Sequence, residues 1–163
     1  MPNTNEVRIK IKSELYEVDA SLFSDENADE DFFVQEGIQD GQSDILEINS
    51  IGTMTLDGDR VTVSYKETEA SGMEGSTTTI SFIKSAPEML TMTREGLVSA
   101  TLVFEESKRH HCIYKTPFMP FEVCVCTQKV VNSILENGSL SLDYIVEIRG
   151  AKAERTKFNM QIL

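Results

Sequence analysis

Hydrophobic and polar residues alternate along much of this chain, with a period of two rather than the 3.6 of a helix. The alternation is clearest in residues 7–12, 61–69, 140–148 and 158–162. In the first of these, Val7, Ile9 and Ile11 are separated by charged residues. A period of two places successive side chains on opposite faces of a β-strand. The pattern therefore predicts a sheet with one buried face.

Short turn motifs separate these segments, at residues 56–59, 71–75, 94–96, 116–120, 137–138 and 149–151. Connections this short join antiparallel strands, because a parallel crossover needs a dozen residues or more. We predict one all-β domain over residues 1–163, an antiparallel meander of eight to ten strands closed or nearly closed into a barrel. Only residues 129–138 indicate a helix, in which Val130, Ile134 and Leu135 share a face and Gly138 ends it.

The net charge of −12 is concentrated in one segment. Residues 13–59 contain fourteen Asp or Glu and no Lys or Arg, whereas the rest of the chain has a slight excess of bases. The densest part, residues 18–43, predicts an acidic loop inserted between the first and second strands. This charge argues against binding to nucleic acid or to an anionic membrane surface. It suits a basic protein partner instead.

The N-terminal residues contain no apolar run of signal-peptide length, and no segment reaches the length of a membrane-spanning helix. We therefore expect a cytoplasmic protein. Three cysteines, an odd number, fit reduced thiols better than a secreted disulfide framework.

Both histidines and all three cysteines lie between residues 110 and 126. A hairpin with a four-residue loop at 117–120 places His111 opposite Cys126, with Cys124 two residues along the same face. These three side chains are the candidates for a zinc site. The C-x-C spacing is not that of a zinc knuckle, so we predict no metal and assign the cysteines as reduced thiols in a strand. A redox or nucleophilic cysteine is the remaining alternative.

A second group of candidates follows from strand phase. Glu67 and Glu69 continue the phase of the preceding apolar residues and Tyr65, and Arg94 continues that of Leu90 and Met92. If this phase faces the interior, Arg94 compensates the buried carboxylates. The predicted ligand-binding residues of the barrel interior are Tyr65, Glu67, Glu69, Arg94, Tyr114 and Tyr144. Two interpretations stay open, a polar anchor in a ligand cavity and a structural ion pair in a filled barrel.

Several short motifs occur in a fixed order between residues 44 and 163. They comprise Tyr65, Glu67, Thr68 and Glu69; Gly72 and Gly75; Thr77–Thr79; Arg94 and Gly96; Tyr114, Thr116, Pro117 and Phe118; and Leu140, Leu142 and Tyr144. Together they resemble the YwiB-like bacterial proteins, a family of unknown function with a calycin-like, lipocalin-type β-barrel. The chain departs from that family at Met119, where glycine is usual. The resemblance implies a fold and brings no activity or catalytic residues.

No enzyme signature is present: the chain lacks a phosphate loop, G-x-S-x-G, H-E-x-x-H and a dinucleotide fingerprint. We therefore predict a protein that is not an enzyme and uses no cofactor. The favoured hypothesis is a binding barrel for a small, partly apolar ligand. The alternative is a protein-interaction module that uses residues 18–43 and binds no small ligand. Either would be a monomer or a homodimer.

Overall fold

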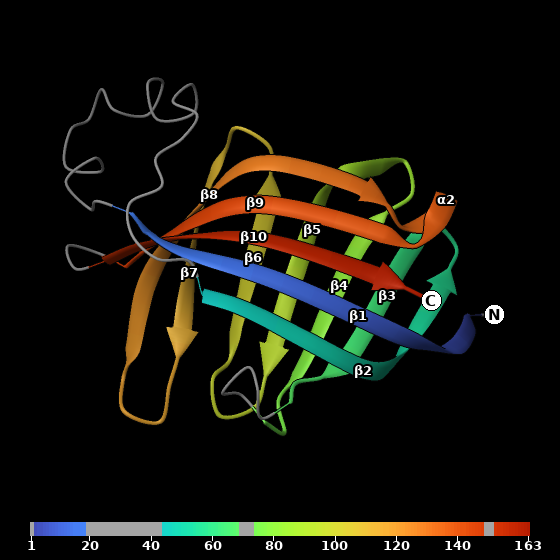
Figure 1. The fold of residues 1–163 in the computed structure, drawn as a ribbon, viewed down its shortest axis with the longest axis horizontal. Coiled ribbons are helices and arrows are strands. Elements are labelled where there is room, and N and C mark those ends of the chain that lie inside the picture. The colour runs from blue at the N-terminus through green and yellow to red at the C-terminus, as the bar shows by residue number, and fades with distance from the viewer. Residues whose placement is uncertain (1, 19–43, 69–73, 149–151) are drawn as a thin grey trace.

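The computed structural model describes residues 2–18, 44–68, 74–148 and 152–163, in which ten strands and one short helix are found (Figure 1). The acidic loop predicted at 18–43 lies outside the described residues, apart from the backbone of its first residue. The strands are β1 (Asn3–Val18), β2 (Asp44–Asp57), β3 (Arg60–Lys66), β4 (Thr77–Ile83), β5 (Ala86–Glu95), β6 (Ala100–Glu105), β7 (Arg109–Lys115), β8 (Pro120–Ser133), β9 (Ser139–Ile148) and β10 (Lys152–Ile162).

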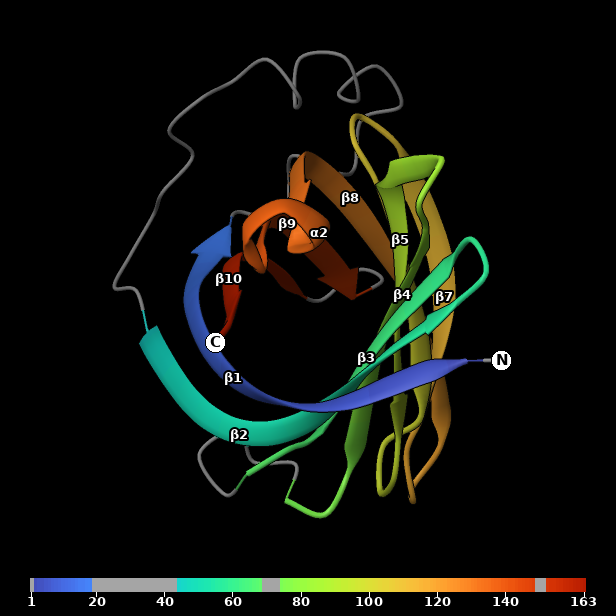
Figure 2. The same ribbon diagram turned by 90° about the vertical axis from the view of Figure 1, so that its right-hand side faces the viewer.

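All ten strands form one antiparallel sheet in the order β6-β5-β4-β3-β2-β1-β10-β9-β8-β7. The first and last strands pair along their length, and the sheet curls round into a barrel (Figure 2). Its two edge strands, β6 and β7, are brought together at a bridge. There Ser99 and Lys115 exchange two backbone hydrogen bonds of 2.9 Å. At the other end, the N–H of Lys108 donates to the carbonyl of Glu105 at 3.0 Å and closes the turn between β6 and β7, and the N–H of Ser107 in this turn donates to the carbonyl of Thr127 in β8 at 2.9 Å. The predicted all-β meander is thus confirmed as a nearly closed barrel.

The alternating apolar residues form the barrel core. Ile9 and Ile11 of β1 and Val61 and Val63 of β3 are almost inaccessible to solvent. Each strand adds further side chains to the same cluster, among them Ile80, Phe82, Leu90, Met92, Leu102, Phe104, Leu140, Leu142, Phe158 and Met160. Burial of this apolar surface is the main source of stability for such a fold.

The helix α2 (Ile134–Asn137) is shorter than the prediction of 129–138. Residues 129–133 instead continue β8, with Val130 opposite Leu142 in β9. A register shift between Thr127 and Lys129 breaks the alternation at this point, which is why the segment has an apparent helical period. The helix ends as predicted: Gly138 has φ 77°, and its N–H donates to the carbonyl of Ile134 at 3.0 Å.

Candidate functional site

The inner face of the barrel changes from apolar to polar toward one end, where β3 ends and β4 begins. Along β3, Val61 and Val63 are followed by Tyr65 and then by Glu67, all buried. The same change occurs in β4, β5, β9 and β10. We call the inward-facing residues at this level the polar layer: Tyr65, Glu67, Thr78, Arg94, Tyr114, Thr127, Tyr144 and Thr156.

The strand register aligns the polar layer in two rows. In one row Tyr65 of β3 lies opposite Thr78 of β4, which lies opposite Arg94 of β5. In the other row Tyr144 of β9 lies between Thr127 of β8 and Thr156 of β10. Directly opposed residues of an antiparallel pair point to the same face with closely spaced Cβ atoms. The sheet therefore brings side chains that are distant in sequence to one level of the barrel.

Glu67 is held by the residues around it. Its side chain is 5% exposed, and the hydroxyl of Thr78 donates a hydrogen bond of 2.6 Å to its Oε1. Its backbone N–H donates to the carbonyl of Ser76 at 2.8 Å. Ser76 in turn packs against Gly96, where a Cβ atom would lie 2.3 Å from the Ser76 hydroxyl oxygen. Gly96, two residues after Arg94, is therefore needed for the close approach of Ser76, whose carbonyl binds the backbone N–H of Glu67.

The three tyrosines of the layer are hydrogen-bond donors at neutral pH. Burial raises the pKa of Tyr114 to about 12, although the charge of Arg94 opposes the change. Burial also raises the pKa of Tyr65 and that of Tyr144 above the ordinary value. Raised pKa values keep all three hydroxyls protonated, because burial disfavours the charged phenolate.

Arg94 is a cation without a full set of partners. Burial disfavours its charge, but interactions with Tyr144, Tyr114, Tyr65 and Glu67 outweigh that effect and raise the pKa of Arg94. Its Nε atom is inaccessible to solvent and has no hydrogen-bond partner among the described residues. The hydroxyl of Thr127 is likewise buried and has no hydrogen-bond partner among the described residues. Unsatisfied buried donors are costly and uncommon, so they indicate a partner such as an ordered water or a ligand group.

Exposure within the polar layer increases toward one end of the barrel. Tyr65 and Tyr144 are buried, Arg94 and Tyr114 are partly exposed, and Glu154 of β10, which interacts with Tyr114, is exposed. Two apolar side chains lie in the loops at this end: Leu97 and Phe118 are 73% and 94% exposed. The loop that carries Leu97 is joined to the end of β7 by the Ser99–Lys115 bridge. Exposed apolar side chains thus lie beyond the polar layer.

Five of the six residues predicted for the barrel interior are brought together in the polar layer. Tyr65, Glu67, Arg94, Tyr114 and Tyr144 interact with one another electrostatically. Glu69 lies outside the described residues. Sequence reasoning missed Thr78, Thr127 and Thr156. Thr78 could have been found from phase, since it alternates with Ile80 and Phe82 on the inward face.

His111, Cys124 and Cys126 lie on the opposite, outer face of β7 and β8, whereas Cys112 shares the inward phase of Tyr114 and packs against the core. Here the predicted register was wrong by two residues: His111 lies opposite Cys124, and Arg109 lies opposite Cys126. The loop is 116–119 rather than 117–120, because Thr116 closes it. Its hydroxyl donates to the carbonyl of Met119 at 2.8 Å and accepts from the N–H of the same residue at 3.2 Å.

Cys124 and Cys126 form a hydrogen-bonded thiol pair. The hydrogen bond from Cys126 lowers the pKa of Cys124 to about 7 against the effect of burial, and His111 and Arg109 contribute. His111 itself is engaged elsewhere, since its Nδ1 lies 3.1 Å from Oε1 of Glu122. Within the described ranges, no group of three or more His, Cys, Asp or Glu side chains is arranged to hold a metal ion.

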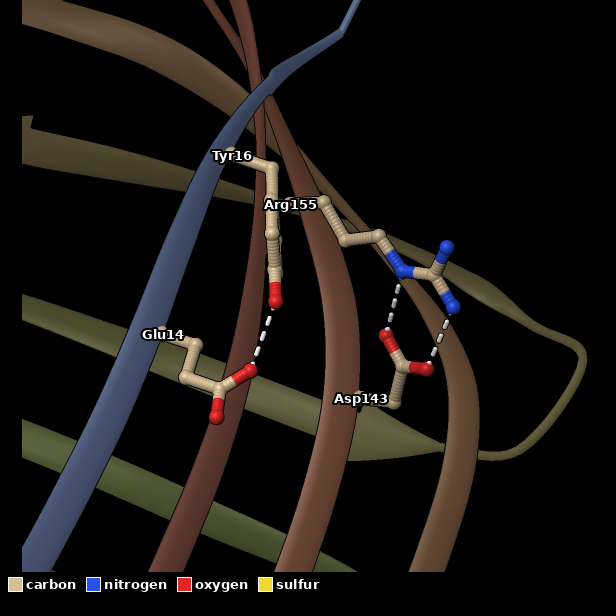
Figure 3. A network of polar contacts seen from close by, with 4 residues as sticks. All are labelled: Glu14, Tyr16, Asp143 and Arg155. Atoms are coloured by element: carbon tan, nitrogen blue, oxygen red, sulfur yellow. Dashed lines mark hydrogen bonds and ion pairs between the residues drawn. The ribbon is translucent and has the colours of Figure 1, made fainter. Parts of the chain in front are cut away.

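The outer face also carries a surface depression of about 210 Å³ over β8, β9 and β10. Its lining residues are Lys129, Ser141, Leu142, Asp143, Lys157 and Asn159. Asp143 is already bound by Arg155, whose Nε and Nη2 donate to its two oxygens at 2.9 and 2.6 Å (Figure 3). Beside this pair the hydroxyl of Tyr16 donates to Glu14 at 2.6 Å (Figure 3). The first contact joins β9 and β10 and the second lies within β1, and we interpret both as structural.

Comparison with known proteins decides the family. The model of a domain of unknown function, DUF1934, matches residues 33–160. The chain belongs to the DUF1934 family. A solved structure, that of the YwiB protein from Bacillus subtilis, is similar over 97% of this chain and 92% of its own, with a TM-score of 0.66 and 15% identity. At this identity the likeness shows a common fold. It confirms the resemblance to YwiB-like proteins inferred from the motifs.

No curated protein matches the chain. In the part of the chain that the structure describes, no helix has the length and apolar character needed to cross a membrane.

Proposed function

We propose that this DUF1934 protein is a cytoplasmic binding protein, rather than an enzyme, that holds a small, partly apolar molecule in the polar layer. The observation that carries this proposal is the unpartnered Nε of Arg94 inside the barrel. A structural ion pair would place the Glu67 carboxylate on Arg94. Instead Glu67 accepts its hydrogen bond from Thr78. An incoming ligand would supply the acceptor that Arg94 lacks.

The surroundings of the layer favour a ligand that is polar at one end and apolar at the other. Toward α2 the barrel is filled by the apolar core, so a ligand reaching Arg94 would extend outward rather than deeper. In that direction lie the exposed side chains of Leu97, Phe118 and Met119. Apolar walls with a few converging polar groups are typical of small-molecule sites.

Native mass spectrometry of the untagged protein, purified without chelator, tests the proposal. We expect an organic molecule bound to the wild-type protein, and reduced occupancy in the double variant Tyr65→Phe, Tyr144→Phe. Loss of two hydroxyl hydrogen bonds with both rings kept would weaken binding about tenfold. Tyr16→Phe removes a hydroxyl from the outer face and serves as the control, with unchanged occupancy. The same spectra determine whether the protein is a monomer or a homodimer.

A bare protein mass, both as purified and after incubation with a small-molecule extract of the source cells, would contradict the proposal. Equal occupancy in the double variant and the wild type would place the ligand outside the polar layer.

A basic protein partner is the second candidate function, favoured by the fourteen acidic residues and absence of bases over residues 13–59. Such a partner would bind through charge and release at high salt. Replacing the acids of 18–43 by Asn and Gln should abolish capture of the partner while leaving the barrel folded. Capture that is unaffected by these changes would exclude this function.

A further inference from the structure

The numbers of hydrogen-bond donors and acceptors in the polar layer are unequal. Arg94 offers N–H donors in a planar fork, and Tyr114 offers a protonated hydroxyl. The hydroxyls of Tyr65 and Tyr144 already hydrogen-bond to Thr78 and Thr156. The carboxylate in the layer, Glu67, already accepts from Thr78. The Nε of Arg94 is therefore a donor that lacks an acceptor among the described residues. A ligand that completes the layer needs oxygen atoms that accept hydrogen bonds rather than groups that donate them.

The charges around the layer select among acceptors. Arg94 contributes one positive charge, and Glu67 and the exposed Glu154 contribute acidic groups on the same inner face. A phosphate monoester carries nearly two negative charges at neutral pH and would be repelled by both acids. A carboxylate carries one charge and has two oxygens that match the guanidinium fork. An ammonium group has no acceptor to offer the Arg94 fork and would leave its Nε unsatisfied.

We propose that the ligand of this barrel is an apolar monocarboxylate, whose carboxylate accepts hydrogen bonds from Arg94 and the tyrosine hydroxyls while its apolar body lies toward the rim around Leu97 and Phe118. The inference rests on the proposed function and gives the chemical class of the ligand. Two features support it independently: the unsatisfied Nε of Arg94, and the exposed apolar side chains of Leu97 and Phe118 in the loops after β5 and β7.

Four probes with one apolar body test this assignment on the unmodified protein: octanoate, octanol, octylamine and octyl phosphate. Isothermal titration calorimetry at constant ionic strength gives each dissociation constant. We expect octanoate to bind about tenfold or more tightly than octanol, since hydrogen bonds to a charged group are stronger than neutral ones. Octylamine and octyl phosphate should bind more weakly than octanoate.

The variant Arg94→Gln identifies the group responsible. It keeps a polar side chain and removes the charge, so it should bring the affinity for octanoate down to that for octanol. Arg8→Gln, which removes the same charge from the exposed face of β1, is the matched control and should retain the preference. If Arg94→Gln does not fold, the ranking of the four probes on the wild-type protein still tests whether the ligand is a monocarboxylate.

The outcomes separate this inference from the proposed function. Equal binding of octanoate and octanol would overturn the monocarboxylate, and so would tighter binding of octyl phosphate or octylamine. Absence of binding by all four, together with a neutral molecule copurifying in the polar layer, would overturn the inference and leave the binding function standing. If no ligand binds, either copurified or added, both the monocarboxylate inference and the proposed binding function are overturned.

Discussion

Thr78 has a larger role than its sequence context in a threonine-rich strand indicates. Its hydroxyl donates a hydrogen bond to the buried carboxylate of Glu67, whereas its neighbour Thr79 lies on the outer face and is hydrogen-bonded to Ser64 at 2.9 Å. The two adjacent threonines therefore differ in structural role. Thr78 satisfies a buried carboxylate, whereas Thr79 forms a hydrogen bond between two partly exposed hydroxyls.

Thr78→Val should destabilise the protein by about 1–3 kcal/mol, because it leaves a buried carboxylate oxygen without its donor. Thr79→Val is the matched control, and we expect it to cost about 0.5 kcal/mol or less, as is usual for surface substitutions. The midpoint of urea unfolding, with the slope checked for constancy, measures both. Equal losses in the two variants would show that the Thr78–Glu67 bond contributes nothing specific.

Cys124 should react as a thiolate at neutral pH whenever local opening of the barrel wall exposes it, since only 7% of the residue is exposed. Its pKa is lowered to about 7, whereas burial raises the pKa of Cys112 to about 11. Only the thiolate is nucleophilic, so alkylation of Cys124 by iodoacetamide should rise through pH 7 while Cys112 stays unreacted until much higher pH. Peptide mass spectrometry of samples quenched between pH 6 and 9 follows each cysteine separately.

Two substitutions of Cys126 test whether its hydrogen bond causes the low pKa of Cys124. Cys126→Ala removes the hydrogen bond that favours the charged form, so the alkylation midpoint of Cys124 should move upward. Cys126→Ser keeps a donor and should leave the midpoint near that of the wild type. An unchanged midpoint in the alanine variant would rule out the hydrogen bond as the source of the low pKa.

At the level of single residues, the sequence identified the charged and aromatic members of the polar layer but not its threonines. Tyr65 and Glu67 could be placed because an unbroken apolar alternation precedes them and sets their phase. Thr127 could not, because the register shift that follows it breaks the phase of β8. Thr156 lies in a short polar segment whose inward face is recognisable only from the apolar residues that follow it.

At the level of elements, Gly52 determines how closely β2 approaches β3. It lies opposite Tyr65 of the polar layer, and a Cβ atom at this position would lie 2.2 Å from the carbonyl oxygen of Ser64 and 2.7 Å from Ile9. The nearest of these atoms belongs to the backbone, which cannot move without separating the two strands. The glycine is therefore needed for the position of the strand that carries Tyr65.

Gly52→Ala should destabilise the barrel by about 1–3 kcal/mol or more, the range found for overpacked sites. Gly58→Ala is the control. Its Cβ would meet nothing within 4 Å, so the expected cost is only that of a positive φ at a turn, about 1 kcal/mol. Thermal unfolding compares the two. A smaller loss at Gly52 than at Gly58 would contradict the close approach.

The register of β7 and β8 and the length of α2 show why some elements could not be derived from sequence. The faces of this hairpin followed from alternation and were predicted as observed, with Cys124 and Cys126 on one side and Val123 and Val125 on the other. The residues that pair across β7 and β8 depend on where the loop between them closes. The side chain of Thr116 closes the loop by a hydrogen bond, and this contact cannot be inferred from the alternation of apolar residues.

At the level of the whole molecule, the barrel is unevenly closed. β1 pairs along its length with β2 and β10, whereas β6 and β7 share the isolated bridge between Ser99 and Lys115 and the turn closed by the hydrogen bond from Lys108 to Glu105. One side-chain contact also spans the seam between β6 and β7, where Nε2 of His110 lies 3.1 Å from Oε1 of Glu105. The seam is therefore the part of the wall with the least backbone pairing.

Hydrogen exchange should reproduce this difference. Amides in the middle of β1 should exchange most slowly, and those of β6 and β7 that point into the seam should exchange fastest among the strand residues. The amides of Ser99 and Lys115 are the internal controls, since their mutual hydrogen bonds should protect them. Equal protection across β6, β7 and β1 would show that the seam is fully closed in solution.

The central claim, that the polar layer is the binding site, is tested most directly by an NMR titration of the assigned protein with octanoate. The account predicts saturable chemical-shift changes concentrated at Tyr65, Glu67, Arg94, Tyr114 and Tyr144, all with one dissociation constant. Changes concentrated instead around Lys129 and Lys157 on the outer face, or none at any concentration, would contradict it.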